Sequence, residues 1–517
     1  MHTITYEQKR FDQLYKDITQ GGPIPYLGRL LQRAARSMPE RTALMYEDTA
    51  ITYAQLYYHA TQFSRTLHDR GVKPRDRVLL LFENSPAYYI GYFGILQIGA
   101  VIAPLNNFLQ EQELAHIIED AKPVLIVVSS ALRVHVEAAT TKKNILLLTE
   151  HDMTLGKPVP HVMEHFEVID LPPEEMTALL YTSGTTGFPK GVMLSSKNII
   201  TNLIQGITRF ELSPDDRIFA VLPLFHSFAQ NTCVWVPMLV GCTIILVPKI
   251  DRRAVIKGLE HKPTVFLGVP ALYGLLCLMK TAPLGSVRIF VSGGDALPDK
   301  IRAGFALIYR RKLCNGYGLT EATPLVSGDV SEELTSAASI GRPLVGITIA
   351  IRDDAGNQLP QGTIGQLWIK GDNIMLGYYN APDMTQSVLH NGWLSTGDLA
   401  YLDHKDRIVI TGRYKDLIIN KGCNIYPQEI ENIILMHPNV IRAGVIGRQD
   451  LDQGEIPVAY VQTKEDDAFL ADQLEKLCAK NLAAYKVPKV FICSTQALPT
   501  TATGKVDKKQ LRKLDRA

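Results

Sequence analysis

The chain has 517 residues, of which 46% are hydrophobic and 21% charged, a composition that is ordinary for a globular protein of two to four domains. Its formal net charge of +2 gives no reason to expect nucleic acid as the main partner. The seven cysteines form no Cys-x-x-Cys pair and the polar N-terminus lacks the apolar core of a signal peptide, so we expect no metal cluster, no disulfide framework and a cytoplasmic location.

The first half of the chain alternates between helical and strand patterns. Helical apolar spacing is present at 27–36 and 86–100. Short apolar runs, typical of buried parallel strands, occur at 77–82, 124–128 and 145–148, and again at 218–222, 243–247, 264–268 and 288–291. This alternation predicts a large N-terminal domain of doubly wound α/β layers.

The most apolar region, 218–247, is interrupted by polar residues and prolines, among them Pro223, His226 and Pro237. Its C-terminal part is about as long as a short membrane span, but a buried strand–helix–strand unit is the favoured interpretation at that length. A peripheral membrane contact stays open as an alternative.

From Gly341 to Thr411 short strand patterns alternate with Gly, Asn and Asp turns, which predicts a small β-rich subdomain. After Gly412 a separate unit begins, with strand patterns at 443–446 and 457–463 and a helix near 472–481. We therefore expect an N-terminal domain over 1–412, its β-rich part at about 341–411, and a small, mobile α+β domain over 413–517. The basic residues of the tail, except Lys505, are expected to form a solvated helical face.

The segment from Tyr181 to Val192, Tyr-Thr-Ser-Gly-Thr-Thr-Gly-Phe-Pro-Lys-Gly-Val, is too polar and flexible for a core. Backbone N–H groups at its glycines can form a concave nest for an anion, to which hydroxyls and a lysine charge add. The candidate phosphate-binding residues are Thr182, Ser183, Gly184, Thr185, Thr186, Gly187 and Lys190. The spacing is not that of a Walker loop, because Pro189 and Gly191 flank the lysine. A flexible surface linker is the alternative.

Two further turns carry candidates for nucleotide binding. The segment Asn315-Gly316-Tyr317-Gly318-Leu319-Thr320-Glu321 places an aromatic ring that can lie flat on a purine near a carboxylate suited to Mg²⁺. The segment Ser292-Gly293-Gly294-Asp295-Ala296-Leu297 follows a predicted parallel strand, and such sheets bind ligands at their carboxyl ends. Taken alone, the first segment is equally compatible with a Gly-rich strand-to-helix turn, and an ordinary tight turn is the favoured interpretation of the second.

Two downstream motifs add charge. Asp398, in Ser-Thr-Gly-Asp-Leu, has a short carboxylate that can hold two vicinal hydroxyls, although a lone Asp after Gly is usually a turn residue. Lys505, in Thr-Gly-Lys-Val, lies on a Gly-flanked loop that can swing a cation into a site and out again.

In this order the motifs resemble those of the adenylate-forming superfamily, which includes acyl-CoA synthetases, luciferases and the adenylation domains of peptide synthetases. Together they span most of the chain. The resemblance implies that a carboxylate and ATP form acyl-AMP and pyrophosphate, and that the acyl group then passes to CoA. It implies ATP, Mg²⁺ and CoA as cofactors.

The resemblance also implies roles for the matching residues. Tyr317 would stack on adenine, Asp398 would bind both ribose hydroxyls, and Glu321, with Thr185, would hold Mg²⁺. The expected nucleotide contacts beyond the phosphate loop are Gly294, Asp295, Ala296, Asn315, Gly316, Tyr317, Gly318, Thr320, Asp398 and Arg413. The expected catalytic set is Lys505, Lys190, His226, Thr320 and Glu321.

The match places the hinge of the C-terminal domain at Lys415. Lys421, Gly422 and Cys423 would lie at the CoA tunnel. For Cys423 we expect a buried or half-buried thiol rather than a nucleophile, since CoA brings its own thiol. Turning about the hinge would exchange Lys505 for the Gly422 face, so that one site serves both steps.

The residues expected around the acyl group are Phe225, His226, Gln230, Val269, Gly293, Gly318 and Leu319. The segments 230–239 and 268–276 are mostly apolar and hold no acidic residue to meet an amino group. This favours an apolar acid, with medium- or long-chain fatty acids first and aryl acids such as cinnamates next.

Other interpretations stay open. An acyl carrier protein is an alternative acceptor, although the segment between Glu321 and Asp398 has no obvious room for the insertion that such ligases usually carry. A non-catalytic acyl or nucleotide sensor is an alternative of a different class. Both a monomer and a homodimer are compatible with the sequence.

Overall fold

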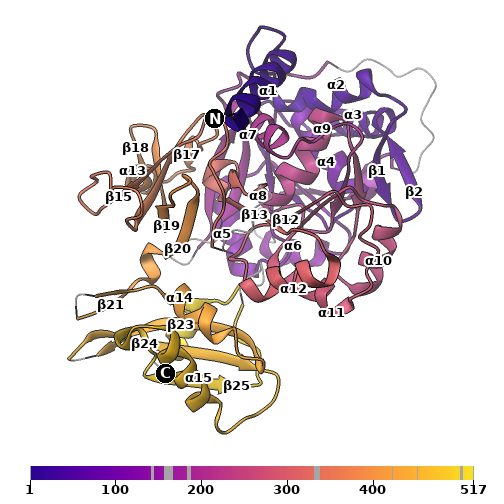
Figure 1. Cartoon of the computed structure of the whole chain (residues 1–517). Helices are drawn as coiled ribbons and strands as arrows, with labels where there is room; N and C mark the ends of the chain where they lie inside the picture. Colours follow the sequence, from indigo (N-terminus) through magenta and orange to yellow (C-terminus); the bar gives the residue numbers. More distant parts are fainter. Residues whose placement is uncertain are drawn as a thin grey trace.

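The computed structural model describes residues 2–140, 145–155, 167–182, 188–330, 338–421, 423–450, 452–500 and 505–515. Figure 1 shows a large part, coloured indigo to magenta, with an orange β-rich sheet beside it and the yellow C-terminal part below. The architecture confirms the predicted fold class: α/β layers, a small β subdomain and a small C-terminal α+β unit.

The first large sheet has seven strands in the order β17-β8-β7-β4-β3-β5-β6. Strands β3 to β7 run parallel, while β8 and β17 are antiparallel to their neighbours. The bounds are β3 (Arg77–Leu81), β4 (Val101–Pro104), β5 (Leu125–Val128), β6 (Leu146–Leu148), β7 (Met176–Thr182), β8 (Lys190–Ser195) and β17 (Gly377–Tyr378). The predicted apolar runs form β3, β5 and β6 because a parallel strand covered on both faces excludes polar side chains.

The second large sheet has eight strands in the order β14-β13-β12-β11-β9-β10-β1-β2. The bounds are β1 (Thr42–Tyr46), β2 (Thr49–Thr52), β9 (Arg217–Ala220), β10 (Thr243–Leu246), β11 (Val265–Gly268), β12 (Ile289–Ser292), β13 (Cys314–Gly318) and β14 (Leu325–Gly328). Only the edge strands β2 and β14 are antiparallel among the described pairings of this sheet. Its parallel strands therefore end at one common edge, where β11, β12 and β13 lie next to one another.

The main core lies between the two sheets and contains helices that are buried almost all round. Helix α4 (Pro86–Gln97) is buried at every position, and it begins where Ser85 accepts a hydrogen bond from the Tyr88 amide with proline at the first helical position. The other helices of this layer are α2 (Leu30–Ser37), α3 (Tyr53–Asp69), α7 (Ser196–Arg209) and α9 (Val236–Val240).

The outer faces of the two sheets are covered by separate sets of helices. Helices α5 (Glu111–Ala121) and α6 (Arg133–Thr140) cover the seven-stranded sheet, and α10 (Arg252–Glu260), α11 (Pro270–Met279) and α12 (Asp299–Tyr309) cover the eight-stranded one. The apolar region 218–247 is a buried strand–helix–strand unit, as predicted, built from β9, α8 (Ser227–Ala229), the π-helix η3 (Gln230–Trp235), α9 and β10. Within the described ranges, no helix is long and apolar enough to cross a membrane.

An N-terminal helix, α1 (His2–Thr19), was not predicted. It packs on α7, where the guanidinium of Arg209 pairs with Glu7. The same guanidinium donates hydrogen bonds to the carbonyl oxygens of Gly328, Arg342 and Pro343. One buried cation thus joins α1, α7 and the segment that leads to the β-rich sheet.

The β-rich sheet contains β15 (Thr348–Arg352), β16 (Gly365–Lys370), β18 (Leu389–His390), β19 (Trp393–Leu402) and β20 (Ile408–Arg413), all antiparallel. The C-terminal part has a second five-stranded sheet of β21 (Ile418–Asn420), β22 (Cys423–Ile425), β23 (Val440–Asp450), β24 (Gly454–Thr463) and β25 (Val490–Ser494). Its helices are α14 (Pro427–Ile434), α15 (Leu470–Asn481) and α16 (Lys508–Leu514). The short 3₁₀ turn η5 (Tyr414–Asp416) joins the two sheets.

Candidate active site

A large cleft of about 2360 Å³ lies at the carboxyl ends of β11, β12 and β13. It is bounded by the large N-terminal part, by the β-rich sheet and, on the far side, by the C-terminal part. Charged residues from positions far apart in the sequence line it together: Lys190, Asp295, Glu321, Asp398, Arg413, Lys415 and Lys505. The fold therefore brings the separate sequence motifs into one site.

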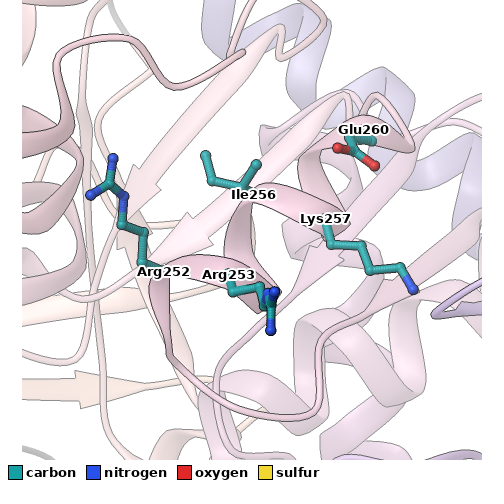
Figure 2. A pocket seen from close by; sticks show the side chains of 5 residues that line it. All are labelled: Arg252, Arg253, Ile256, Lys257 and Glu260. Atoms are coloured by element: carbon teal, nitrogen blue, oxygen red, sulfur yellow. The ribbon is translucent and has the colours of Figure 1, made fainter.

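A second, smaller pocket of about 550 Å³ lies on the surface of α10 and holds no comparable arrangement. Figure 2 shows that Arg252 and Arg253 point in different directions, and Lys257 is already paired with Asp48 at 2.9 Å. Polar groups do not converge on this pocket, so we place the functional site in the large cleft.

Lys190 and Glu321 lie together on one side of the cleft. Lys190 Nζ is 3.2 Å from Glu321 Oε1, and both side chains are largely buried. Tyr378 completes a triangle: its hydroxyl donates to Glu321 Oε1 at 2.8 Å and accepts from Lys190 Nζ at 2.5 Å. Burial, and then the Glu321 charge, raises the pKa of the Tyr378 phenol, so it stays protonated. The predicted phosphate and metal residues are thus in contact.

Tyr317 and Asp398 form a second group, at the nucleotide site predicted from the sequence. The Tyr317 hydroxyl donates to Asp398 Oδ2, and Arg413 Nε lies 3.0 Å from Asp398 Oδ1. The Asp398 carboxylate raises the pKa of the Arg413 guanidinium, which stays charged. Gly318 has no room for a side chain, because a Cβ would come 2.0 Å from the carbonyl oxygen of Pro324. The glycine therefore allows the close approach of β13 to the backbone just before β14.

Lys505 enters the cleft from the C-terminal part. Its Nζ is 4.0 Å from Asp295 Oδ1. Burial lowers the pKa of the Lys505 ammonium, and the Asp295 carboxylate opposes that shift. Burial, and then the charge of Lys505, lowers the pKa of His226 to about 4, so this imidazole is neutral at physiological pH. His226 Nδ1 accepts a hydrogen bond from the Phe228 amide, which fixes its tautomer and ring.

The lowered pKa of Lys505 gives a testable pH dependence. A lysine with a lowered pKa loses its proton, and therefore its charge, at a lower pH than an ordinary lysine. We expect the adenylation rate to fall as pH rises through that lowered value, and the Lys505→Arg variant to keep its rate to higher pH, because guanidinium stays charged. The rate of single-turnover acyl-AMP formation, measured from about pH 6 to about pH 11 in steps of roughly half a pH unit, gives the pH profile of each protein. If the rate falls over the same alkaline pH range in wild type and in Lys505→Arg, deprotonation of Lys505 is not the cause of that fall.

Several predicted residues line the cleft and others do not. Thr182, Phe225, Gly293, Gly294, Ala296, Asn315, Gly316, Leu319 and Thr320 all line it. Gln230 does not: its side chain is fully buried and bonds to Tyr92 and to the carbonyl of Phe225, so it supports the pocket from behind. Val269 is likewise not a lining residue, although it packs beside Gly294. Ser183, Gly184, Thr185, Thr186, Gly187 and Gly422 lie outside the described residues.

Some functional residues were missed by the sequence reasoning. Asn231 and Thr232 line the cleft in place of Gln230 because η3 is a π-helix, whose wider turn shifts the side-chain positions. Tyr378 was missed because nothing in the local sequence Gly377-Tyr378-Tyr379 indicates chemistry. Its proximity to Lys190 results from the pairing of its strand with the strand that starts at Lys190, which no local pattern indicates.

The proposed hinge and CoA residues occupy different places. Lys415 lines the cleft, and burial, followed by the charge of Arg413, lowers its pKa. Lys421 and Cys423 lie on the β21–β22 hairpin and do not line the cleft. Cys423 is exposed, which corrects the expectation of a buried or half-buried thiol: it begins β22, the edge strand of its sheet, which pairs only with β21 among the described strands.

The tail is only in part the solvated face that we expected, because Lys509 and Lys513 are exposed but two other basic residues are paired. Lys508 Nζ pairs with Glu431 at 2.6 Å, and Arg512 pairs with Asp416 at 2.7 Å, next to the proposed hinge. Helix α16 packs on β23 through Leu511, which is fully buried. These contacts fix the segment that follows Lys505 to the body of the C-terminal part.

The cleft fits Mg²⁺ and a polyphosphate. Glu321 supplies a carboxylate of the kind that Mg²⁺ binds, and Lys190 lies beside it to meet a phosphate oxygen. Thr182 Oγ1 is buried with no hydrogen-bond partner among the described residues, an unused donor at the entry to the phosphate loop. A tetrahedral zinc site is not supported, because the described residues hold no group of three His, Cys, Asp or Glu that could bind a metal.

Comparisons with known proteins identify the family of this chain. The family model described as "AMP-binding enzyme" matches residues 31–379, and that of the "AMP-binding enzyme C-terminal domain" matches residues 429–505. The chain thus belongs to the AMP-binding enzyme family, the adenylate-forming superfamily that the motifs indicated.

The relatives act on different acids. A feruloyl-CoA synthase from Amycolatopsis sp is 33% identical, covering 94% of this chain and 98% of its own. A long-chain-fatty-acid–CoA ligase from Bacillus subtilis (strain 168) is 30% identical, covering 96% of each chain. The solved structure of O-succinylbenzoate coenzyme A synthetase from Bacillus subtilis, in complex with ATP and magnesium ion, is 28% identical with a TM-score of 0.84, covering 94% of this chain and 99% of that one.

Proposed function

We propose that the acid this protein activates is apolar and elongated, a medium- or long-chain fatty acid, within the class of ATP-dependent acid–CoA ligases to which it belongs. The products are acyl-CoA, AMP and pyrophosphate. The observation that carries this proposal is the apolar lining of the cleft along strands β11 and β12, the part that we call the inner branch.

The inner branch runs along the eight-stranded sheet. Val265 and Leu267 of β11 point to the same face, as do Ile289 and Val291 of β12, and all four line it. Gly293, just after β12, and Ile289, at its amino end, both line this part and lie roughly 13 Å apart along the chain, at about 3.3 Å per residue. A branch of this length favours an extended chain over a short acid such as acetate.

The rest of the branch is also apolar. Gly206 of α7 and Leu325 of the edge strand β14 also line the cleft, as do Phe210, Leu212 and Ile218. The acidic residues that line the cleft, such as Asp295, Glu321 and Asp398, belong to the nucleotide side. An amino acid substrate would leave its ammonium group without a partner in the inner branch, which argues for an uncharged chain.

The first half-reaction follows from the charged residues. A carboxylate oxygen of the acid attacks the α-phosphorus of ATP, the bond to the bridging oxygen breaks, and pyrophosphate leaves with that electron pair. Lys505 faces the reacting end of the cleft, where it stabilises the charge that builds on the phosphorus oxygens. Lys190 offsets the charge of the departing pyrophosphate, and Mg²⁺, when bound at Glu321, supplies further neutralisation.

The second half-reaction needs the other face of the C-terminal part. Turning about Lys415 takes Lys505 out of the cleft and brings in the hairpin that carries Lys421 and Cys423. The sulfur of CoA then attacks the acyl carbonyl carbon, AMP leaves with the electron pair of the acyl–phosphate bond, and the thiol proton passes to solvent. The present position of that hairpin outside the cleft agrees with the adenylation arrangement.

A coupled mass-spectrometric assay tests this function. The protein receives ATP, Mg²⁺, CoA and acids from acetate through long fatty acids to cinnamates. AMP and acyl-CoA formed together, with fatty acids preferred, support the proposal. A preference for cinnamates assigns an aryl-acid ligase, acyl-AMP without acyl-CoA moves the acceptor to a carrier protein, and no ATP–pyrophosphate exchange with any acid favours a sensor.

Filling the inner branch should change chain-length preference. A leucine in place of Gly206 projects towards Leu325, whose Cδ2 lies only 3.4 Å from where the new Cβ would stand. We expect the Gly206→Leu variant to lose about tenfold or more in kcat/KM for long acids while short acids change little, since pocket volume discriminates by this order. The matched control is Gly285→Leu, where nothing lies within 4 Å of an added Cβ. Equal losses for short and long acids would contradict this path.

A further inference from the structure

We propose that Tyr378 is a positioning residue for the metal–nucleotide site. Its hydroxyl holds the carboxylate of Glu321 and the ammonium of Lys190 in the orientation that binds Mg²⁺–ATP. The inference rests on the proposed function for its reaction, but concerns a residue outside every motif that indicated that function. Three contacts carry it: Tyr378 to Glu321, Tyr378 to Lys190, and Lys190 to Glu321.

The backbone places Tyr378 for this role. It lies on the two-residue strand β17, which pairs with β8 so that Tyr378 is opposite Val192. Residues two apart on a strand share a face, so Tyr378 is the diagonal neighbour of Lys190, a distance that aromatic and long side chains span. The Tyr378 ring lies under the ammonium, with Nζ 3.9 Å from the ring centroid.

The strand itself is held from behind. The Tyr378 amide donates to Thr385 Oγ1 of α13 (Pro382–Val388) at 2.9 Å. A Cβ on Gly377 would lie 2.9 Å from Thr385 Cγ2, so the two elements are in close contact. The phenol therefore presents a fixed hydroxyl to Glu321 rather than a mobile one.

Glu321 needs such a partner. It lies in the short 3₁₀ turn η4 (Thr320–Ala322), whose backbone is tied to Met375 by a hydrogen bond from the Met375 amide to the Glu321 carbonyl. That bond fixes the main chain but leaves the carboxylate free to rotate. The Tyr378 hydroxyl and the Lys190 ammonium both contact Oε1 of Glu321. These two contacts favour one rotamer of the carboxylate and leave its other oxygen, Oε2, for a metal ion. Partners of this kind orient metal ligands and raise metal affinity.

The test measures metal–nucleotide binding directly. Binding of Mn²⁺–ATP to wild type, Tyr378→Phe and Tyr379→Phe is followed by electron paramagnetic resonance, and the half-saturating Mg²⁺ concentration by ATP–pyrophosphate exchange. We expect Tyr378→Phe to bind Mn²⁺–ATP about 10–100-fold more weakly and to raise the half-saturating Mg²⁺ concentration by a similar factor. The neighbouring Tyr379→Phe variant is the matched control and should equal wild type, as should thioester formation by Tyr378→Phe from supplied acyl-AMP and CoA.

Other outcomes overturn the inference. Equal Mn²⁺–ATP binding by wild type and Tyr378→Phe, or no binding by wild type, removes the assigned role. An equal effect in Tyr379→Phe would show a structural role of the strand instead. Should Tyr378→Phe fail to fold, Tyr378→His, which keeps a ring and a donor, must restore binding to within about tenfold of wild type for the inference to stand. Failure of the proposed function is distinguishable, because wild type would then bind Mn²⁺–ATP and still give no exchange with any acid.

Discussion

Replacing Lys505 by alanine is expected to slow acyl-AMP formation ~10²–10³-fold, the effect of losing one preorganised transition-state donor. The structure supports this size, because Lys505 lines the cleft from the C-terminal part and its Nζ lies 4.0 Å from Asp295 Oδ1. The Lys505 side chain is 38% exposed, so its effect depends on where the charge is held rather than on exclusion of solvent. Single-turnover formation of acyl-AMP from ATP and the acid measures the loss.

The second half-reaction provides the control. Lys505 leaves the cleft when the C-terminal part turns, so thioester formation from supplied acyl-AMP and CoA should be nearly unchanged in the same variant. Lys513→Ala, a change at an exposed tail lysine, should leave both steps at the wild-type rate. Equal losses of Lys505→Ala in the two steps would refute the role assigned to Lys505.

Replacing Arg209 by methionine is expected to destabilise the N-terminal part by about 3–5 kcal/mol, the cost of leaving a buried charge without its partner. The Arg209 side chain is only 6% exposed and that of Glu7 15% exposed, so water cannot take over their contacts. The substitution also leaves the carbonyls of Gly328, Arg342 and Pro343 without this donor. Urea unfolding followed by circular dichroism, analysed for the first transition of a multidomain chain, measures the change.

A double substitution separates charge from packing. Adding Glu7→Gln to Arg209→Met removes the orphaned carboxylate, so part of the lost stability should return. If Arg209→Met lowers the free energy of unfolding by less than about 1 kcal/mol, the Arg209–Glu7 pair contributes no more than a surface ion pair. Arg209 would then not stabilise the contact between α1, α7 and the segment that leads to the β-rich sheet.

The strands and the order of the motifs were predictable from the sequence because their signals are local. The apolar runs at 77–82 and 264–268 became β3 and β11 nearly residue for residue, since a strand covered on both faces must be apolar throughout. Asp295 and Glu321 converge because each follows a parallel strand at the carboxyl edge of one sheet. Lys190 and Asp398 reach the same cleft from other sheets, and Lys505 from the C-terminal part, which is a property of the fold rather than of any one motif.

The features that the sequence did not reveal depend on partners far away in the chain. Helix α1 reads as a polar segment, and its pairing with Arg209 spans 202 positions. The tail lysines and arginines read as solvated, but Arg512 meets Asp416 across 96 positions. Tyr378 reaches Lys190 only through strand pairing. Local patterns report which face of an element is apolar, but they do not report which charge on another element will meet it.

The exposed Cys423 on the β21–β22 hairpin gives the protein a natural attachment point. Every other cysteine of the chain is buried or half-buried. A maleimide dye or spin label should therefore react first at Cys423, on the side of the C-terminal part that the proposed turn about Lys415 carries into the cleft. The distance between a label at that position and a second probe on α10 would report the rotation of the C-terminal part during one catalytic cycle. No native thiol would have to be removed for this measurement.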